Sequence, residues 1–323
     1  MINIVTGGAG FLGSYLSEAI LRYDMSCKVI AIDNLLTGTR FNLINALRNE
    51  RFDFYECDIR DFDINYEYSI IHRELQSEDV DTIYNLACPA SPVDYIKYPL
   101  ESLHAGSTGI FNLLDTCRIL DCNLIHASTS EVYGDPLVNP QTESYWGNVN
   151  PIGIRSVYDE SKRFAEATIM AYRRTYGLNT KIIRIFNTYG PRMKVNDGRV
   201  VPNFIYQALN DKPITIYGDG KQTRSFCFYR DTINGIIRVR ERGDNNPYNI
   251  GNPEEYSILD LAQMIKKICK TNNNLVFKPL PSDDPKQRKP DITRMKELGW
   301  QPTTDIWSGL EQTIEWFKNE KKK

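Results

Sequence analysis

Short apolar runs alternate along the first 190 residues with longer segments in which apolar side chains recur every three or four positions. The runs predict strands at 2–6, 28–32, 52–56, 82–86, 123–127 and 180–185. The periodic segments predict helices at 12–22, 66–76, 101–121 and 157–176. Regular alternation of strands and helices is typical of an α/β fold with a doubly wound parallel sheet. Ligands of such folds bind at the carboxyl ends of the strands.

Glycines separate the first predicted strand from the first predicted helix. Gly7, Gly10 and Gly13 follow a G-x-x-G-x-x-G spacing, which permits a tight turn and brings backbone N–H groups close to a pyrophosphate. The second predicted strand ends in Asp33, about 20 residues further on, where an acid binds the adenine ribose hydroxyls. A carboxylate there repels a 2′-phosphate. The pattern therefore predicts a Rossmann-type nucleotide site that prefers NAD to NADP.

Beyond about residue 190 the pattern changes, because prolines and glycines separate much shorter elements. A chain of 323 residues can form either one large domain or two unequal lobes. We predict an NAD-binding Rossmann domain at 1–190 and a smaller α/β lobe at 191–323 that mainly binds substrate. Some segments of the second lobe are expected to return to the first.

A tyrosine and a lysine stand one helical turn apart in the predicted helix 157–176. The spacing of Tyr158 and Lys162 places both side chains on the same helix face. The Lys162 ammonium, together with a positive nicotinamide ring, can lower the pKa of Tyr158, which then serves as general base for a substrate hydroxyl. Thr129 or Ser128, about 30 residues upstream, would hold that hydroxyl. This combination predicts a dehydrogenase-type active site.

Composition excludes several other classes of protein. The 39 basic and 41 acidic residues nearly cancel and form no basic stripe, so no nucleic-acid partner is expected. No apolar run approaches the roughly 18 residues of a membrane-spanning helix, and Met1 leads directly into the first strand, so neither a membrane segment nor a signal peptide is expected. Seven cysteines without a C-x-x-C pair and three scattered histidines indicate reduced thiols and no metal site. We predict a cytoplasmic location.

The glycine spacing and several longer motifs are similar to those of one family. G-x-x-G-x-x-G is typical of the extended short-chain dehydrogenase/reductase superfamily. N-L-A-C-P-A-S-P at 85–92, S-T-S-E-V-Y-G-D-P at 128–136, Y-W-G-N-V-N-P-I-G at 145–153 and R-I-F-N-T-Y-G-P-R-M at 184–193 resemble segments of the UDP-glucuronate decarboxylase (UDP-xylose synthase) family. The likeness extends over nearly the whole chain. It departs where His104-Ala105-Gly106 replaces Lys-Thr-Asn, which leaves a family lysine contact near the substrate unmatched.

The resemblance implies an NAD-dependent conversion of UDP-glucuronate to UDP-xylose. Oxidation of the C4 hydroxyl gives a β-keto acid, carbon dioxide leaves from C6, and the retained NADH returns hydride to C4 with no net redox change. Tyr158 would hydrogen-bond the intermediate enolate. The resemblance assigns decarboxylation and C5 protonation to Glu131 and Arg288. The implied catalytic residues are Thr129, Ser130, Glu131, Tyr158, Lys162 and Arg288.

Two further sets of contacts are expected at the strand ends and in the second lobe. The implied cofactor contacts are Gly7, Gly10, Phe11, Leu12, Gly13, Asp33, Asn34, Thr37, Gly38, Asp58, Ile59, Leu86, Ala87, Cys88, Ala127, Tyr158, Lys162, Thr188 and Arg199. The implied substrate contacts are Pro89, Thr129, Glu131, Tyr158, Asn187, Arg192, Val201, Tyr217, Gln222, Arg224 and Arg288. Asn187, Arg192 and Arg224 suit phosphates, and Tyr217 either stacks on uracil or packs in the core.

Rival activities share the same predicted fold. A 4,6-dehydratase is expected to have an Asp-Glu pair where Ser130-Glu131 stands, a 4-epimerase to lack the acid, and an apiose/xylose synthase to have Cys at position 130. A decarboxylase that releases the 4-keto pentose and NADH remains an alternative. So does an NAD-sensing binding protein, which would not need Tyr158 and Lys162. The predicted helices 101–121 and 157–176 resemble those that pair in superfamily dimers, so the resemblance implies a homodimer.

Overall fold

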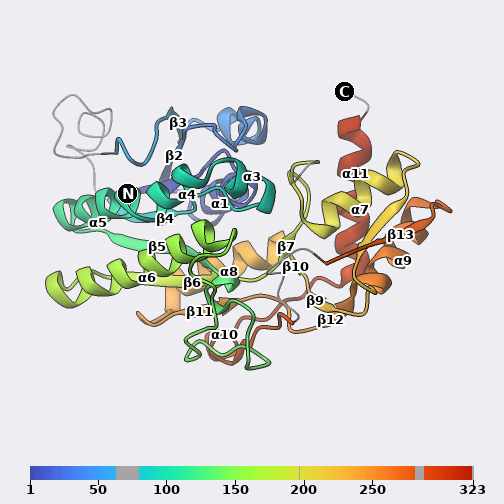
Figure 1. Cartoon of the computed structure of the whole chain (residues 1–323). Helices are drawn as coiled ribbons and strands as arrows, with labels where there is room; N and C mark the ends of the chain where they lie inside the picture. The colour runs from blue at the N-terminus through green and yellow to red at the C-terminus, as the bar shows by residue number, and fades with distance from the viewer. Residues whose placement is uncertain (63–79, 196, 281–286, 322–323) are drawn as a thin grey trace.

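Seven parallel strands form the central sheet of the larger lobe (Figure 1). The computed structural model describes residues 1–62, 80–195, 197–280 and 287–321. The strands are β1 (Ile2–Thr6), β2 (Lys28–Asp33), β3 (Phe52–Glu56), β4 (Val80–Asn85), β5 (Asn123–Thr129), β6 (Thr180–Ile185) and β11 (Tyr248–Ile250). Their order is β11-β6-β5-β4-β1-β2-β3. The strand order reverses at β1, and such a switch point opens a crevice at the carboxyl ends of the strands.

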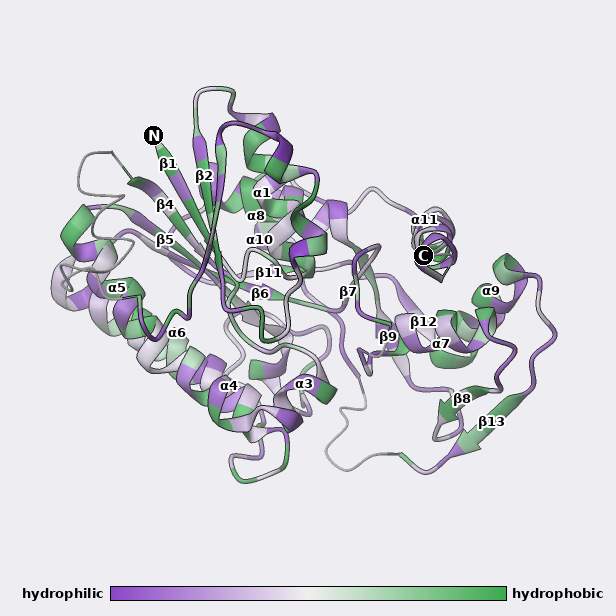
Figure 2. Ribbon diagram, turned by 90° about the horizontal axis from the view of Figure 1, so that it is seen from above, coloured by the Kyte–Doolittle hydropathy of each residue, from purple (hydrophilic) through white to green (hydrophobic). Residues whose placement is uncertain are grey.

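Helices cover both faces of this sheet, because successive strand residues point to opposite sides and both sides are apolar. Val5 and Ala31 lie in a core with α1 (Phe11–Tyr23), α8 (Tyr229–Arg242) and α10 (Thr293–Glu297). Ile4 and Ile83 lie in a second core with α5 (Thr108–Leu120) and α6 (Ser156–Tyr176). Figure 2 shows the two layers on either side of the strands. The predicted doubly wound Rossmann-type fold is confirmed.

The structure corrects one predicted helix of this lobe, and a second predicted helix lies outside the residues that the structure describes. The single helix expected at 101–121 is two helices, α4 (Pro99–Gly106) and α5, separated at Ser107. The Ser107 hydroxyl donates to the Leu103 carbonyl at 2.7 Å, and serine bonds of this kind bend helices. Gly106 packs so closely on α6 that a Cβ would overlap the Ser161 carbonyl oxygen. The helix predicted at 66–76 lies outside the described residues.

The smaller lobe surrounds its own apolar core, which includes Phe204, Ile214, Leu261 and Leu310. Its helices are α7 (Val200–Leu209), α9 (Ile258–Cys269) and α11 (Ile306–Lys321), and α3 (Pro92–Lys97) lies across from them on the larger lobe. Its short strand pairs are β8 (Ile214–Tyr217) with β13 (Leu275–Lys278), β9 (Thr223–Ser225) with β12 (Glu255–Ser257), and β7 (Thr188–Tyr189) with β10 (Cys227–Phe228). Because α8, β11 and α10 return to the larger lobe, the chain crosses between the lobes several times.

Two features bear on the predicted location. Among the residues that the structure describes, no helix has both the length and the apolar character needed to cross a membrane. The seven cysteines are free thiols, and four of them are buried. The cytoplasmic location remains a prediction from the sequence.

Candidate active site

A cavity of about 1380 Å³ lies between the two lobes at the carboxyl ends of β1, β2, β4 and β5. All the catalytic, cofactor and substrate residues predicted from the sequence line it, with the exception of Gly38. Gly38 instead packs on Asp33, where a Cβ would lie 2.9 Å from both carboxylate oxygens. The fold therefore gathers residues from position 7 to position 288 around one space.

The glycine turn forms one wall of the cavity. Gly7 has a φ of +69°, and a Cβ there would lie 2.6 Å from the backbone of Leu86. A Cβ on Gly13 would overlap the carbonyl oxygen of Gly7. Gly10 donates its N–H to that same carbonyl at 3.1 Å and is followed directly by the first turn of α1. All three glycines line the cavity, so backbone N–H groups at the helix N-terminus can approach a pyrophosphate there.

Asp33 ends β2 at the same edge of the sheet. Its two carboxylate oxygens accept from the N–H groups of Ala9 at 3.0 Å and Leu35 at 2.8 Å. Burial raises the pKa of Asp33, and the two backbone bonds work in the opposite direction. The carboxylate is fixed beside the glycine turn, so the residues present suit the ribose hydroxyls of a dinucleotide.

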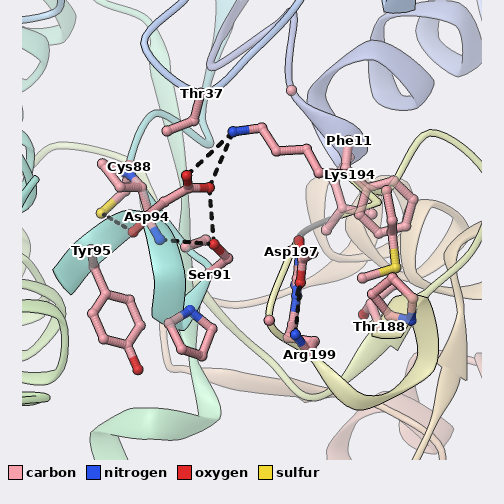
Figure 3. Close-up of a pocket in the computed structure, with 18 of the residues that line it drawn as sticks. Phe11, Thr37, Cys88, Ser91, Asp94, Tyr95, Thr188, Lys194, Asp197 and Arg199 are labelled. Carbon is pink, nitrogen blue, oxygen red and sulfur yellow. Dashed lines mark hydrogen bonds and ion pairs between the residues drawn. The ribbon is translucent and has the colours of Figure 1, made fainter. Parts of the chain in front are cut away.

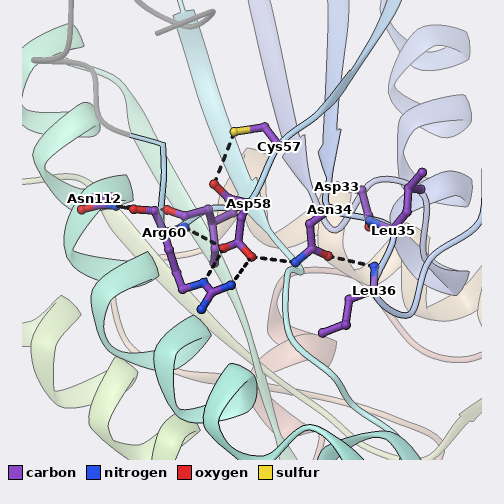
Figure 4. A network of polar contacts seen from close by, with 9 residues as sticks. Asp33, Asn34, Leu35, Leu36, Cys57, Asp58, Arg60 and Asn112 are labelled. Carbon is purple, nitrogen blue, oxygen red and sulfur yellow. Dashed lines mark hydrogen bonds and ion pairs between the residues drawn. The ribbon is translucent and has the colours of Figure 1, made fainter.

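A polar network continues from Asp33 along the strand ends (Figure 4). Asn34 donates to Asp58 at 2.7 Å, and the Arg60 guanidinium donates to both Asp58 oxygens at 3.0 and 2.9 Å. Burial of Asp58 favours the neutral form, but the bonds from Arg60 and Asn34 outweigh it and lower the pKa of Asp58. Asp58 is therefore an oriented acceptor in the cavity wall. Its predicted contact with the adenine amino group remains a prediction.

Tyr158 and Lys162 lie on the first turns of α6, buried against the end of β5. The Tyr158 ring stacks on Tyr95 of α3 with ring centroids 5.1 Å apart. The Lys162 ammonium donates to the Ala127 carbonyl at 2.7 Å and lies 6.0 Å from the centre of the Tyr158 ring. Their placement on one face of a single helix confirms the spacing argument.

The protein's own groups set the protonation of this pair. Burial raises the pKa of Tyr158, and a hydrogen bond with Thr129 and the charge of Arg199 oppose the rise. Burial also lowers the pKa of Lys162. The sequence argument predicted a lowered tyrosine pKa, and the residues alone produce the opposite direction because desolvation dominates. A lowered pKa of Tyr158 would therefore require the positive nicotinamide ring that the argument included.

A second charged cluster lies beside the tyrosine. Glu131 follows Thr129 at the end of β5, in a short 3₁₀ turn capped by the Thr129 hydroxyl. The Glu131 carboxylate forms ion pairs with Arg288 through one oxygen and with Arg155 through the other. Arg288 also contacts the Ser130 hydroxyl at 3.4 Å and the Gly134 carbonyl at 3.1 Å. Burial lowers the pKa of Arg288 to about 10, so the guanidinium remains charged at neutral pH.

Two lining residues of this cluster were missed from the sequence. Arg155 precedes α6, accepts the Tyr158 N–H through its carbonyl at 3.0 Å, and pairs with Glu131 through its side chain. Tyr95 lies in α3, close behind the 85–92 motif, and covers the Tyr158 ring. The available signals were the position of Arg155 one helical turn before Tyr158 and the closeness of Tyr95 to a recognised motif.

The residues predicted for the nucleotide line the far end of the cavity. Tyr217 is 43 % exposed, so the alternative that it packs in the core is wrong. Gln222 donates to the Tyr217 carbonyl at 2.6 Å, and Arg224 donates to the Thr223 carbonyl at 2.9 Å. Arg192 donates to Glu18 at 2.6 Å and to the Ser14 hydroxyl at 3.1 Å. The phosphate contacts predicted for these side chains remain predictions.

Residues 3–251 match the model of the NAD dependent epimerase/dehydratase family. The chain belongs to this family. NAD, the cofactor predicted from the glycine turn and Asp33, is thereby confirmed.

UDP-glucuronic acid decarboxylase 2 of Arabidopsis thaliana is 45 % identical over 98 % of this chain and 68 % of its own length. UDP-glucuronic acid decarboxylase 1 of Danio rerio is 42 % identical over 98 % of this chain and 72 % of its own length. These relatives confirm the resemblance drawn from the sequence motifs.

Solved structures of this family superimpose over almost the entire chain. UDP-glucose 4-epimerase of Thermotoga maritima, solved with UDP-glucose, has a TM-score of 0.89, 28 % identity and 99 % coverage of both chains. UDP-glucuronic acid 4-epimerase of Bacillus cereus, solved with UDP-glucuronic acid and NAD, has a TM-score of 0.86 and 30 % identity, covering 99 % of this chain and 100 % of its own. The sheet and lobe arrangement is therefore shared with enzymes that bind UDP-sugars.

Proposed function

We propose that this protein is an NAD-dependent lyase that converts UDP-glucuronate to UDP-xylose through a UDP-4-keto intermediate. The observation that carries the proposal is the Glu131–Arg288 pair next to Tyr158, at the carboxyl end of β5. Near-full-length identity of 42 to 45 % to UDP-glucuronic acid decarboxylases supports it. The glycine turn and Asp33 would hold NAD, which would supply the hydride acceptor for C4 and the hydride donor for its later reduction.

Tyr158, Thr129 and Lys162, here called the tyrosine cluster, act in the oxidation of C4. Tyr158 accepts the proton of the C4 hydroxyl as a general base, and Thr129 orients that hydroxyl by hydrogen bonding. Lys162 is a charged neighbour on the same helix face, held by the Ala127 carbonyl at 2.7 Å. After oxidation the Tyr158 phenol is a hydrogen-bond donor toward the oxygen on C4, where negative charge develops.

The Glu131 cluster serves the loss of carbon dioxide. The C5–C6 bond breaks, carbon dioxide leaves, and the electron pair moves to the C4 oxygen as an enolate. C5 then takes up one proton, and the regained ketone is reduced to the hydroxyl. Glu131 pairs with Arg288 and Arg155 through its two oxygens and so keeps both cations from stabilising the sugar carboxylate, which favours loss of carbon dioxide. Because Arg288 remains charged at neutral pH, we assign the proton transfer to water bound at this cluster.

The test of this proposal is product analysis with UDP-[6-¹³C]glucuronate and NAD. We expect labelled carbon dioxide and UDP-xylose, identified by mass spectrometry and NMR. A 4-epimerase is the second candidate, because the solved relatives include a UDP-glucuronic acid 4-epimerase of the same fold. That activity would keep the label in the sugar nucleotide and invert C4. Labelled carbon dioxide with UDP-4-keto-pentose as the end product would instead identify an oxidative decarboxylase.

Asp33 is expected to set the preference for NAD over NADP. Asp33→Ala removes a fixed carboxylate that binds hydroxyls and repels a 2′-phosphate, so the ratio of the two affinities should fall by about tenfold or more. Isothermal titration with NAD and with NADP measures both affinities. Asp53→Ala, in β3, removes a carboxylate outside the cavity and should leave the ratio unchanged. Equal affinities in the wild-type protein would contradict the assignment.

We also propose a homodimer formed through α4, α5 and α6, which lie along one side of the larger lobe (Figure 2). This side exposes apolar side chains, namely Leu100, Leu103, Phe111 and Phe164. The resemblance of these helices to those that pair in superfamily dimers makes a second copy of this chain the expected occupant. Phe164→Glu should shift the protein from dimer to monomer in analytical ultracentrifugation. Phe277→Glu, on β13 of the smaller lobe, is the matched control, and a monomeric wild-type protein would overturn the proposal.

A further inference from the structure

One stretch of the smaller lobe forms ion pairs with both sides of the cofactor crevice. Arg192 donates to Glu18 on α1 at 2.6 Å, and Lys194 lies 3.2 Å from an Asp94 oxygen on α3. The helix α1 follows β1 and α3 follows β4, and these neighbouring strands flank the switch point. The four residues Arg192, Lys194, Glu18 and Asp94, here called the clasp, therefore bridge the crevice in which a dinucleotide binds.

The Lys194 half of the clasp extends over the cavity itself. Figure 3 shows the Lys194 side chain reaching across the pocket to Asp94, with Thr37 close to its ammonium group. Lys194, Asp94 and Thr37 all line the cavity. The Lys194 charge also acts on Asp33, which places the ammonium near the end of the site predicted for the adenine ribose. The Asp94–Lys194 pair therefore crosses the cavity in which we expect the cofactor to bind.

Local structure holds Asp94, one partner of that pair, in place. Asp94 accepts from the Ser91 hydroxyl at 2.9 Å, and its N–H donates to the same hydroxyl at 3.1 Å, so the carboxylate is oriented by the helix cap of α3. Gly198 has a φ of +84° and lies against Val93, where a Cβ would be 2.6 Å from a methyl carbon. The backbone at Gly198 therefore packs against α3 beside Asp94. Lys194, with 44 % of its side chain exposed, is the partner that can move.

We propose that the Asp94–Lys194 pair retains NAD(H) in its crevice through the catalytic cycle. The reaction proposed above requires the hydride taken from C4 to return to the same sugar, so the reduced cofactor must stay bound while carbon dioxide leaves. If the proposed function holds, retention of NADH by this pair also favours UDP-xylose over released UDP-4-keto-pentose as the product. Arg192 anchors the other end of the clasp through Glu18 and stacks over the Tyr15 ring at 4.1 Å.

The experiment measures NADH dissociation from the protein without any sugar nucleotide. Bound NADH is followed by its fluorescence and chased with excess NAD in a stopped-flow instrument. Lys194→Met and Asp94→Asn should each release NADH about two- to fivefold faster, the range expected for a partly exposed ion pair. Asp94→Asn keeps an acceptor for Ser91 and changes only the charge. Raising the salt concentration should speed release from the wild-type protein and leave Lys194→Met almost unchanged.

Three further variants separate the clasp from a general effect of charge. Lys28→Met breaks the Lys28–Asp53 pair of 2.8 Å, whose partners are 33 % and 41 % exposed. It should release NADH at the wild-type rate. The double variant Asp94→Lys with Lys194→Asp rebuilds the pair in reverse and should restore slower release than Asp94→Lys alone. Wild-type release rates in both Lys194→Met and Asp94→Asn would overturn the proposal.

Product analysis then tests the consequence for the reaction. With UDP-glucuronate, Lys194→Met should raise the share of UDP-4-keto-pentose among the products by the same two- to fivefold factor as the NADH release. An unchanged product ratio together with faster NADH release would limit the clasp to cofactor retention. Faster NADH release in a protein that forms no carbon dioxide would support the clasp and overturn the decarboxylase proposal. The two failures are therefore distinguishable.

Discussion

Tyr158→Phe is expected to lower turnover of UDP-glucuronate by about 10²–10⁴-fold, the usual contribution of a general base. The variant removes only the phenolic oxygen that accepts the C4 hydroxyl proton. The ring remains stacked on Tyr95, and Lys162 keeps its bond to the Ala127 carbonyl. NAD affinity and the unfolding midpoint should therefore change little. Single-turnover kinetics that follow NADH formation measure the oxidation step directly.

A buried tyrosine outside the cavity provides the control for this variant. Tyr84 in β4 is 2 % exposed and does not line the cavity. Tyr84→Phe makes the same chemical change and should leave turnover close to that of the wild-type protein. A Tyr158→Phe protein that retains more than about a tenth of wild-type turnover would exclude Tyr158 as the base.

Glu131→Gln is expected to slow carbon dioxide release by about 10²-fold or more while UDP binding changes little. The amide keeps the size of the side chain but removes the charge that pairs with Arg288 and Arg155. Oxidation of C4 relies on the separate tyrosine cluster, so NADH and the 4-keto acid should accumulate. Quenched reactions with UDP-[6-¹³C]glucuronate measure both the retained label and the released carbon dioxide.

Arg288→Lys distinguishes two roles for the arginine. If Arg288 acts with Glu131 in the chemical step, kcat falls. If it mainly binds the sugar carboxylate, KM rises with kcat nearly unchanged.

Glu160→Gln on α6 is the control for Glu131→Gln, because Glu160 is a half-exposed carboxylate that pairs with Arg163 outside the cavity. Carbon dioxide release at the wild-type rate in Glu131→Gln would contradict the assignment of decarboxylation to this cluster.

Much of the larger lobe could be predicted from the sequence because its signals are local. Strand runs, helical periodicity and the Gly7–Gly10–Gly13 turn each depend on neighbouring residues. The β11 strand was missed because Tyr248–Ile250 is too short to show a period, and its place at the sheet edge comes from pairing with β6. The break at Ser107 was missed because it depends on a side-chain bond and on close packing against α6.

Many of the residues that line the cavity were predicted from the sequence, but their arrangement was not. The sequence by itself determined the fold class, the NAD site and the Tyr158–Lys162 spacing, since these follow from short-range patterns. Only the tertiary structure decided that Arg155 shares Glu131 with Arg288, a partner 157 residues away from Glu131. It likewise decided the clasp, whose Arg192 and Lys194 meet partners 174 and 100 residues distant. Contacts between residues so far apart depend on how the two lobes pack, and no local pattern in the sequence encodes that packing.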